Sequence, residues 1–419
     1  MKILHLSHSD ISGGAARAAY RLHRALLEVG IESQMKVRIK KSDDWTVRGA
    51  QGGLGKLVNM LRGGVGSQLT KLQRTMNVNF HSCNWIPSNW AKQINDSDVD
   101  IVHLHWVAGE TMSVEDIGRI KKPIVWTMHD MWPFCGSEHV TEFDETARWR
   151  LGYTRLNRGE FERGFDLDRH TWLRKIKSWR QPMHIVSPSN WLAECARGSI
   201  LLQDKKISIV PNTLNTEVYK PLDHLFCRKV LNLPEDKKII LFGAMGGGKD
   251  NNKGYDLLVS ALDILSARYK FDDVLCVVFG QSEPQHVSVL PFKVHWLGHI
   301  HDDETLALLY NAATMMVVPS RKENLPQTAT EAQACGTPVV AFNCTGLTDV
   351  IEHKQTGYLA QAYDTQDMAT GMQWILENKT ECERLGVNSR IRAQELWAMD
   401  VVVKQYQLIY CDVLNVSCI

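Results

Sequence analysis

Two glutamates with seven residues between them, Glu323 and Glu331, stand in the segment RKENLPQTATEAQACGTPVV. Pro326 suits the first turn of a helix, because the N–H that proline lacks would be unpaired there. The amides of that turn, from about Leu325 to Thr328, carry the positive end of the helix dipole and can hold an anion. The segment therefore predicts a site in which amides bind a diphosphate and the two carboxylates accept hydrogen bonds from sugar or ribose hydroxyls.

A glycine-rich loop elsewhere in the chain offers the cations that such an anion needs. Residues 239–243 (IILFG) predict a buried strand, and the loop from there to Gly254 carries Lys249 and Lys253. A lysine can stabilise a departing diphosphate as a point charge, without a metal ion. We therefore expect this loop to complete the diphosphate site.

Two short patterns resemble metal sites. Asp98 and Asp100 form a D-x-D, but they lead directly into an expected strand at 101–105, so we interpret them as a loop-to-strand junction. His103 and His105 share one face of that strand, and two imidazoles can bind a metal ion. No third ligand stands nearby in the sequence, so we expect both histidines to be structural and no metal to take part.

Apolar strands alternate with amphipathic helices in two successive runs. Expected strands lie at 2–7, 33–37, 101–105, 124–129 and 184–187, and then at 207–210, 239–243, 274–280, 294–297, 315–319 and 338–342. Such alternation predicts parallel sheets built of βαβ units. We expect an N-terminal α/β domain over 1–214, a C-terminal one over 215–392, and terminal helices over 393–419.

Composition bounds the partners and the compartment. The 419 residues carry a net charge of +1, which gives no general reason to expect nucleic acid as a partner. The sequence contains no apolar run long enough to span a membrane and no export signal at its start. None of the ten cysteines forms a C-x-x-C pair, so we expect reduced thiols and a cytoplasmic protein.

One segment, 54–76 (LGKLVNMLRGGVGSQLTKLQRTM), is basic and amphipathic and lacks acidic residues. This pattern is typical of a helix that touches anionic lipid at the membrane surface. A helix packed against its own domain is the alternative. Gly63 and Gly64 are expected to break the helix in two.

Motifs in the same order as in one known family extend over nearly the whole chain. The phrase from Glu323 to Val340 resembles the E-x7-E segment of retaining family 4 (group 1) glycosyltransferases. The other matching motifs are Gly13-Gly14, TMHDMWPF at 127–134, SPSNWL at 187–192, PNT at 211–213, LGHI and LYNAA within 297–313, and Lys253-Gly254. The resemblance is weakest at about 49–98 and 137–175.

The resemblance implies the GT-B fold, in which two Rossmann-like domains face each other across a cleft, with terminal helices that return to the N-terminal domain. It implies transfer of a sugar, with retention of configuration, from a nucleotide diphosphate sugar to a glycan or lipid-linked acceptor in bacterial surface polysaccharide synthesis. No cofactor or metal is implied. The implied donor-side residues are Glu331 for the ribose, Glu323 with the amides of Asn324, Leu325, Pro326 and Gln327 for sugar and phosphate, Lys253 for the leaving group, and Gly13 and Gly14 for close approach to phosphate. His129 would lie beside the donor sugar.

The sequence departs from the family at one position. Ala244 stands where the family commonly has an arginine after the strand 239–243, and we expect Lys249 to substitute for it. This departure keeps an alternative open, namely a non-catalytic sugar-nucleotide-binding or scaffold protein on the same fold.

Overall fold

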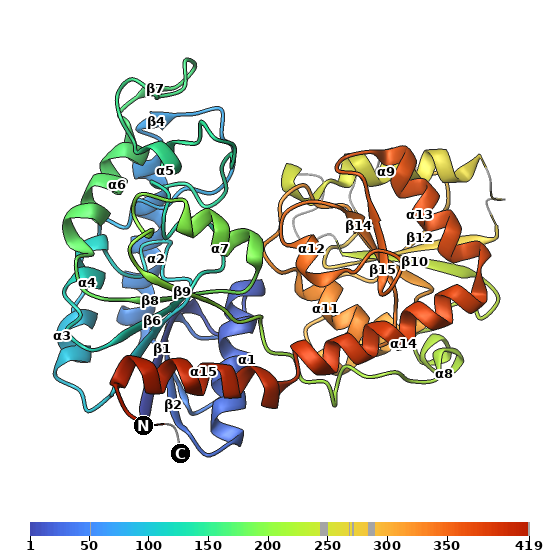
Figure 1. Cartoon of the computed structure of the whole chain (residues 1–419), viewed down its shortest axis with the longest axis horizontal. Coiled ribbons are helices and arrows are strands. Elements are labelled where there is room, and N and C mark those ends of the chain that lie inside the picture. Colours follow the sequence, from blue (N-terminus) through green and yellow to red (C-terminus); the bar gives the residue numbers. More distant parts are fainter. Residues whose placement is uncertain (51, 244–249, 268, 270–271, 284–289, 418–419) are drawn as a thin grey trace. The chain divides into compact units, whose positions relative to one another are not determined.

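The computed structural model describes residues 1–50, 52–243, 250–267, 269, 272–283 and 290–417. The chain forms two compact units (Figure 1). Unit 1 comprises Met1–Thr213 and Val402–Ile419, and unit 2 comprises Leu214–Val401. The division falls one residue before the boundary expected after 214. Residues 393–401, which we expected to return with the last helices, stay in unit 2.

A parallel sheet forms the centre of unit 1. Its strands are β1 (Lys2–Ser9), β2 (Glu32–Ile39), β3 (Val47–Arg48), β5 (Ile101–Leu104), β6 (Ile124–Thr127), β8 (His184–Ser187) and β9 (Lys206–Ile209), in the spatial order β3-β2-β1-β5-β6-β8-β9. The chain order reverses between β1 and β5. Asp98 and Asp100 precede β5 and both contact Lys2, so their interpretation as a loop-to-strand junction is confirmed.

Helices cover this sheet where apolar stripes and capping residues direct them. The helices of this unit are α1 (Gly14–Glu28), α2 (Gly52–Thr70), α3 (Trp90–Asn95), α4 (Val114–Gly118), α5 (Arg148–Leu151), α6 (Leu167–Ser178), α7 (Asn190–Arg197) and α15 (Met399–Leu414). Helix α1 buries an alanine- and leucine-rich face that includes Ala19 and Leu26. The side chains of Ser113, Asp166 and Ser189 accept from first-turn amides of α4, α6 and α7, which fixes where these helices begin.

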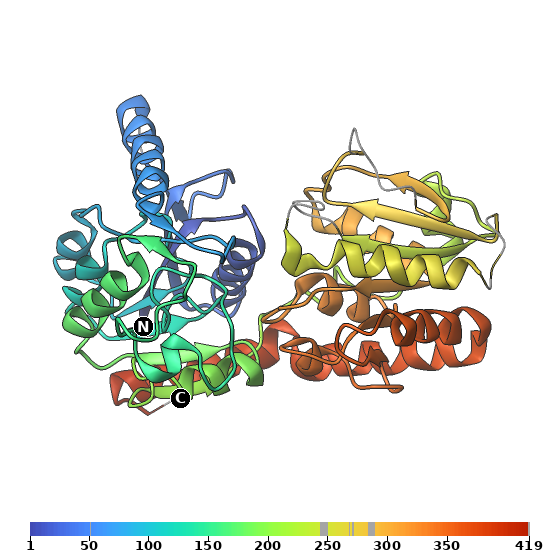
Figure 2. The same cartoon turned by 90° about the horizontal axis from the view of Figure 1, so that it is seen from above.

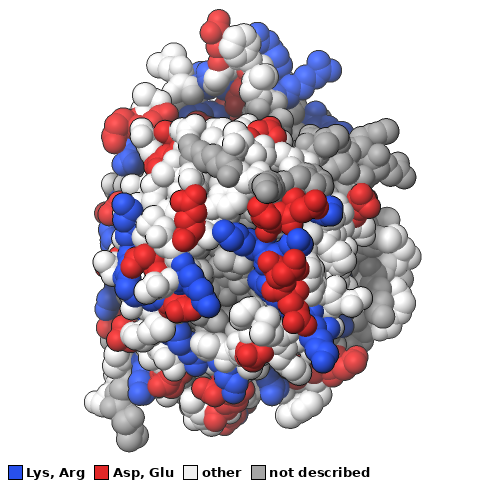
Figure 3. All heavy atoms as spheres, turned by 90° about the vertical axis from the view of Figure 1, so that its right-hand side faces the viewer, with Lys and Arg blue, Asp and Glu red and all other residues white. Residues whose placement is uncertain are grey.

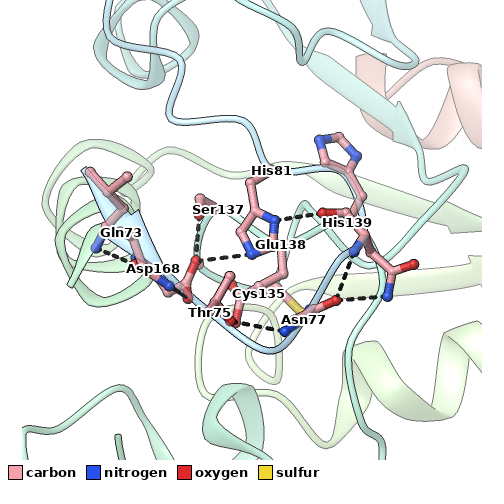
Figure 4. Close-up of polar contacts among 12 residues, drawn as sticks. Gln73, Thr75, Asn77, His81, Cys135, Ser137, Glu138, His139 and Asp168 are labelled. Atoms are coloured by element: carbon pink, nitrogen blue, oxygen red, sulfur yellow. Dashed lines mark hydrogen bonds and ion pairs between the residues drawn. The ribbon is translucent and has the colours of Figure 1, made fainter. Parts of the chain in front are cut away.

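The region in which the resemblance is weakest contributes a buried polar core to unit 1. Figure 4 shows Gln73, Ser137 and His81 gathered around the carboxylate of Asp168. Gln73 donates to Asp168 at 2.5 Å, Ser137 donates to its other oxygen, and His81 lies 3.8 Å from it. A short antiparallel pair, β4 (Gln73–Arg74) with β7 (Arg163–Gly164), closes the same region. These contacts join segments that lie far apart in the sequence.

Unit 2 contains a second parallel sheet. Its strands are β10 (Lys238–Gly243), β11 (Val274–Phe279), β12 (Lys293–Trp296), β13 (Met315–Val318), β14 (Val339–Phe342) and β15 (Gly357–Ala360), in the order β12-β11-β10-β13-β14-β15. Alternate residues of β10 enter two apolar clusters on opposite faces, Leu241 in one and Phe242 in the other. Both faces are therefore covered, as parallel sheets require.

The helices of unit 2 are α8 (His224–Val230), the 3-10 turn η2 (Asn251–Lys253), α9 (Tyr255–Ser266), α10 (Asp303–Ala312), α11 (Gln327–Ala334), α12 (Leu347–Val350), α13 (Thr365–Glu377) and α14 (Lys379–Leu396). The chain order of the sheet reverses between β10 and β13, so the loops that follow these two strands open at one point of the sheet edge. In open α/β sheets this point is the usual place of a ligand.

Helix α2 differs from the expectation for the basic segment 54–76. It runs unbroken through Gly63 and Gly64, and Figure 2 shows it, in light blue, projecting from the rest of unit 1. The prediction of a break at the glycines was therefore wrong. Leu57 and Leu61, one turn apart, are about half exposed at 47% and 55%. Among the described helices, none is long and apolar enough to cross a bilayer.

Candidate functional site

An ion pair lies at the reversal point of the sheet in unit 2. Lys253 ends η2, which follows β10, and Glu323 lies in the loop after β13. The ammonium of Lys253 is 2.6 Å from Oε1 of Glu323, and the hydroxyl of Ser320 donates to the same oxygen at 2.9 Å. Attraction by the Glu323 carboxylate raises the pKa of Lys253, although burial opposes this. The structure thus brings together Lys253 and Glu323, for which we predicted roles toward the leaving group and toward the sugar and phosphate.

The backbone beside Lys253 permits only glycine. Gly254 adopts a left-handed conformation with φ +63°, and a Cβ on it would lie 1.9 Å from the carbonyl oxygen of Pro319. The amide of Arg321 donates to the Asn252 carbonyl at 2.7 Å in the same contact. The Lys-Gly pair of the sequence therefore serves to bring the loop after β10 against the loop after β13.

A third loop, between β14 and α12, clamps the backbone of Glu323. The Glu323 amide donates to the hydroxyl of Thr345 at 3.1 Å, and its carbonyl accepts from the amide of Gly346 at 2.9 Å. A Cβ on Gly346 would lie 1.4 Å from the carbonyl oxygen of Asn324. The carboxylate of Glu323 is consequently held on a backbone fixed from two sides.

Helix α11 begins where the sequence predicted. Pro326 is its N-cap residue, and the amides of Ala329 and Thr330 both bond to the Pro326 carbonyl, at 3.1 and 3.3 Å. The residues Asn324 to Gln327 therefore form the approach to the amino end of a helix, directly after Glu323. The side chain of Leu325 is buried in the apolar core, so only its backbone can face a ligand.

Glu331 lies inside α11 and is only 3% exposed. Its Oε2 accepts a hydrogen bond of 2.8 Å from the hydroxyl of Tyr310, on α10. Burial, together with the negative charge of Glu331, raises the pKa of Tyr310 well above its ordinary value. Glu331 is therefore a buried, hydrogen-bonded carboxylate and not a solvated helix charge. Its role toward a ribose stays a prediction.

Sequence reasoning gave no role to Arg321 or Tyr310. The guanidinium of Arg321 pairs with both carboxylate oxygens of Asp256, at 2.8 and 2.6 Å, and this hydrogen-bonded pair lowers the pKa of Asp256. It joins the loop after β13 to the first turn of α9. We expected Lys249 to substitute for the arginine that the family has at the position of Ala244. Both residues lie outside the described residues.

The surface around unit 2 offers no extended field of one sign on the face shown in Figure 3. Acidic and basic side chains alternate over that face.

The candidate residues of unit 1 lie at the carboxyl edge of its own sheet. Gly13, with φ +89°, caps α1, and its carbonyl accepts from the amide of Arg17 at 3.0 Å. Gly14 is the first residue of that helix. His129, two residues after β6, lines a small cavity within unit 1 together with His105, Thr127 and Tyr406.

His103 of β5 and His105, just after that strand, have a third histidine neighbour that the sequence spacing did not reveal. His5 of β1 is in register with His103, and the ligand atoms of His5, His103 and His105 lie within 4.8 Å of one another. The expectation that no third imidazole is near was therefore wrong. Both ring nitrogens of His103 already contact hydroxyls, Nδ1 that of Tyr410 at 2.7 Å and Nε2 that of Thr127 at 2.8 Å. The cluster is hydrogen-bonded core.

Comparison with known proteins supports one class. The fold is that of the GT-B glycosyltransferases. A sucrose-phosphate synthase from Thermosynechococcus elongatus has a TM-score of 0.67 at 19% identity, with 100% of both chains covered. The Anabaena protein HepE, in complex with UDP and glucose, has a TM-score of 0.62 at 15% identity and covers 98% of this chain and 100% of its own.

Two family models specify the class further. One described as Glycosyltransferase Family 4 matches residues 12–218, and one described as Glycosyl transferases group 1 matches residues 225–392. The chain belongs to the family 4, group 1 glycosyltransferases. An N-acetyl-alpha-D-glucosaminyl L-malate synthase of Bacillus anthracis is 26% identical over 216 residues, which are 51% of this chain and 55% of that protein. The chain spans about half the length of the curated relatives it matches.

Proposed function

We propose that the protein transfers a sugar, with retention of configuration, from a nucleotide diphosphate sugar bound by unit 2 to a glycan or lipid-linked acceptor in bacterial surface polysaccharide synthesis. The observation that carries this proposal is the pair of Lys253 and Glu323 beside the amino end of α11. A cation, a carboxylate and a helix end at the reversal point of a parallel sheet suit a diphosphate attached to a polyhydroxyl group.

Each part of the donor would bind the protein groups that complement its charge. The diphosphate would bind the amides from Asn324 to Gln327 and the ammonium of Lys253, while Glu323 would accept from a sugar hydroxyl. Glu331 would accept from the ribose. UDP and glucose bound to the Anabaena HepE protein support a donor of this kind.

The reaction needs no covalent intermediate on the protein. The acceptor hydroxyl oxygen forms a bond to the anomeric carbon as the bond from that carbon to the phosphate oxygen breaks. The nucleoside diphosphate leaves with the electron pair, and its oxygen takes the proton of the acceptor hydroxyl. Lys253 and the end of α11 would stabilise the charge that develops on the leaving group, and we therefore propose a metal-independent reaction.

The acceptor would approach along unit 1, past Gly13, Gly14 and His129, while the two glycines would also meet the donor phosphate and His129 the donor sugar. We further propose that the protein works at the inner face of the cell membrane, with α2 as its contact. The half-exposed Leu57 and Leu61 support this contact. The guanidinium of Arg62 donates to the carbonyls of Ile86 and Glu110 at 2.6 and 3.1 Å, so Arg62 anchors α2 to unit 1. The basic residues that would contact the lipid are therefore Lys71 and Arg74.

The deciding experiment is a screen of purified protein against UDP-, GDP-, ADP- and dTDP-sugars, by thermal shift and by slow release of nucleoside diphosphate, with and without EDTA. The expected result is one donor that stabilises and is hydrolysed independently of EDTA. Glu323→Gln should lose hydrolysis, whereas the exposed Glu304→Gln on α10 should not. No response to any donor or to free UDP and GDP would overturn the proposal in favour of a scaffold on this fold.

A further inference from the structure

Three imidazoles in unit 1 are joined end to end. Nδ1 of His5, on β1, lies 2.9 Å from Nε2 of His105, and Nδ1 of His105 lies 3.2 Å from Nε2 of His129. The rings of the two pairs are inclined by only 20° and 27°, with centroids 5.2 and 5.4 Å apart. This spacing is that of rings linked edge to edge by a single N–H···N hydrogen bond.

We propose that His5 and His105 are positioning residues that fix His129 in the tautomer with its proton on Nδ1, so that His129 meets its ligand as a hydrogen-bond donor. The inference rests on the proposed function for the identity of the ligand, a hydroxyl or phosphate oxygen of a substrate. The tautomer itself is a property of unit 1 alone.

The environment of His5, at one end of the chain of imidazoles, determines which ring donates in each hydrogen bond. Nε2 of His5 is buried and has no hydrogen-bond partner among the described residues. Among buried backbone groups in proteins, an N–H without an acceptor is rarer than an acceptor that lacks a donor, and we apply the same preference to this ring. The proton of His5 therefore belongs on Nδ1, from which it is donated to His105.

The remaining protons follow from that choice. His105 accepts at Nε2 and so carries its own proton on Nδ1, which it donates to Nε2 of His129. His129 then holds its proton on Nδ1, the ring nitrogen that the chain of imidazoles leaves for a substrate oxygen. With Nε2 accepting and Nδ1 protonated, His129 cannot serve as a general base, in keeping with the leaving phosphate as the proton acceptor.

Each of these rings is neutral at physiological pH. Burial lowers the pKa of His5 and His105 well below the ordinary value, and that of His129 to about 4. Asp130, the acidic neighbour of His129, acts in the opposite direction, but its carboxylate also bonds to Trp106 and His139. When all three rings are neutral, each of the two N···N contacts holds one proton and the third proton lies on a nitrogen at one end. Both hydrogen bonds therefore have to point the same way along the chain of imidazoles.

His103 keeps the middle ring from turning. Its ring lies on the face of His105, with centroids 4.2 Å apart and an angle of 26°. The hydroxyls of Tyr410 and Thr127 hold both of its nitrogens. Rotation of His105 out of line would therefore disturb a second hydrogen-bonded ring.

Nitrogen-15 NMR of the full chain labelled at histidine tests the tautomers directly. The signals of His129 are assigned by their loss in His129→Gln. We expect His105 and His129 to be neutral with the proton on Nδ1. A wild-type His129 protonated on Nε2, or exchanging between both forms, would overturn the proposal. This measurement needs no substrate, so an inactive protein would refute the proposed function without affecting the answer here.

Two variants of His5 add a functional reading. His5→Asn keeps an N–H close to the position of Nδ1, whereas His5→Leu removes the donor and leaves similar bulk. We expect His5→Leu to give His129 mixed tautomers and to lower kcat/KM by about tenfold, the effect of one neutral hydrogen bond, and His5→Asn to rescue both. Equal tautomers and equal rates in the two variants, with thermal unfolding showing both folded, would reject the positioning role.

Discussion

The ammonium of Lys253 lies 2.6 Å from the carboxylate of Glu323, although 70 residues separate the two along the chain. Strands β10 and β13 are neighbours only because the chain order reverses there, so the pair depends on the topology of the sheet. A bound diphosphate would compete with Glu323 for the ammonium and release the carboxylate to a sugar hydroxyl. The pair thus keeps both groups in place before the donor arrives.

Removal of this ammonium should slow turnover more than it weakens donor binding. Lys253→Ala is expected to lower kcat by about 10²–10³-fold, because a cation aimed at the leaving group acts mainly in the transition state. Steady-state kinetics with the donor found by screening measures this. Lys293→Ala removes a lysine from the exposed pair with Asp272 in the same unit and serves as control. Full kcat in Lys253→Ala would exclude the assigned role.

The amino-acid sequence was sufficient to predict the elements that position this site. The expected strand at 315–319 predicted the loop after β13, and Pro326 predicted the start of α11, because both features depend on local sequence. It also selected Lys253 and Glu323. It could not show that Gly254 and Gly346 join three loops, since those close approaches arise only when β10, β13 and β14 are side by side.

The contacts that sequence reasoning missed are long-range. His5 joins His103 through the register of two parallel strands, a relationship that no local spacing reveals. Tyr310 contacts Glu331 because α10 and α11 pack together. The motif LYNAA includes Tyr310, but the motif alone does not indicate this contact. Gly63 and Gly64 lower helix propensity, but α2 continues through them.

Loss of the Tyr310 hydroxyl should affect both stability and donor affinity. Tyr310→Phe leaves a buried carboxylate without this donor, and we expect a loss of about 1–3 kcal/mol in unfolding free energy. Reorientation of Glu331 should also raise the Kd for the nucleoside diphosphate, measured by calorimetry. Tyr358→Phe, which removes a 2.7 Å bond to Asp367, is the matched control. It should cost stability only, and an equal Kd in both variants would contradict the ribose role of Glu331.

The buried histidines should make the protein sensitive to mild acid. Burial lowers the pKa of His23 and of His129 from 6.5 to about 4, so both stay neutral in the folded state while the unfolded chain takes up protons. The unfolding free energy should be fully retained above pH 6.5 and fall between there and about pH 4. Each histidine contributes about 1.4 kcal/mol per pH unit within that window.

Urea unfolding at a series of pH values between about 7 and 5 measures this slope. His23→Gln should reduce it by one proton, whereas His224→Gln, an exposed position on α8, should leave it unchanged. Equal slopes in wild type and His23→Gln would show that His23 is not buried in its neutral form.

The exposed face of α2 should determine membrane binding. Leu57→Glu with Leu61→Glu places two charges one turn apart on a face that is half exposed, so folding should be unaffected while partition into a bilayer becomes unfavourable. Co-sedimentation with phosphatidylcholine vesicles containing phosphatidylglycerol should fall by at least about tenfold. Wild-type binding should weaken in vesicles of phosphatidylcholine alone, because Lys71 and Arg74 then lack anionic partners. Val387→Glu, an exposed apolar position on α14, should bind as the wild type does. Undiminished binding of the double variant would assign the contact to another surface.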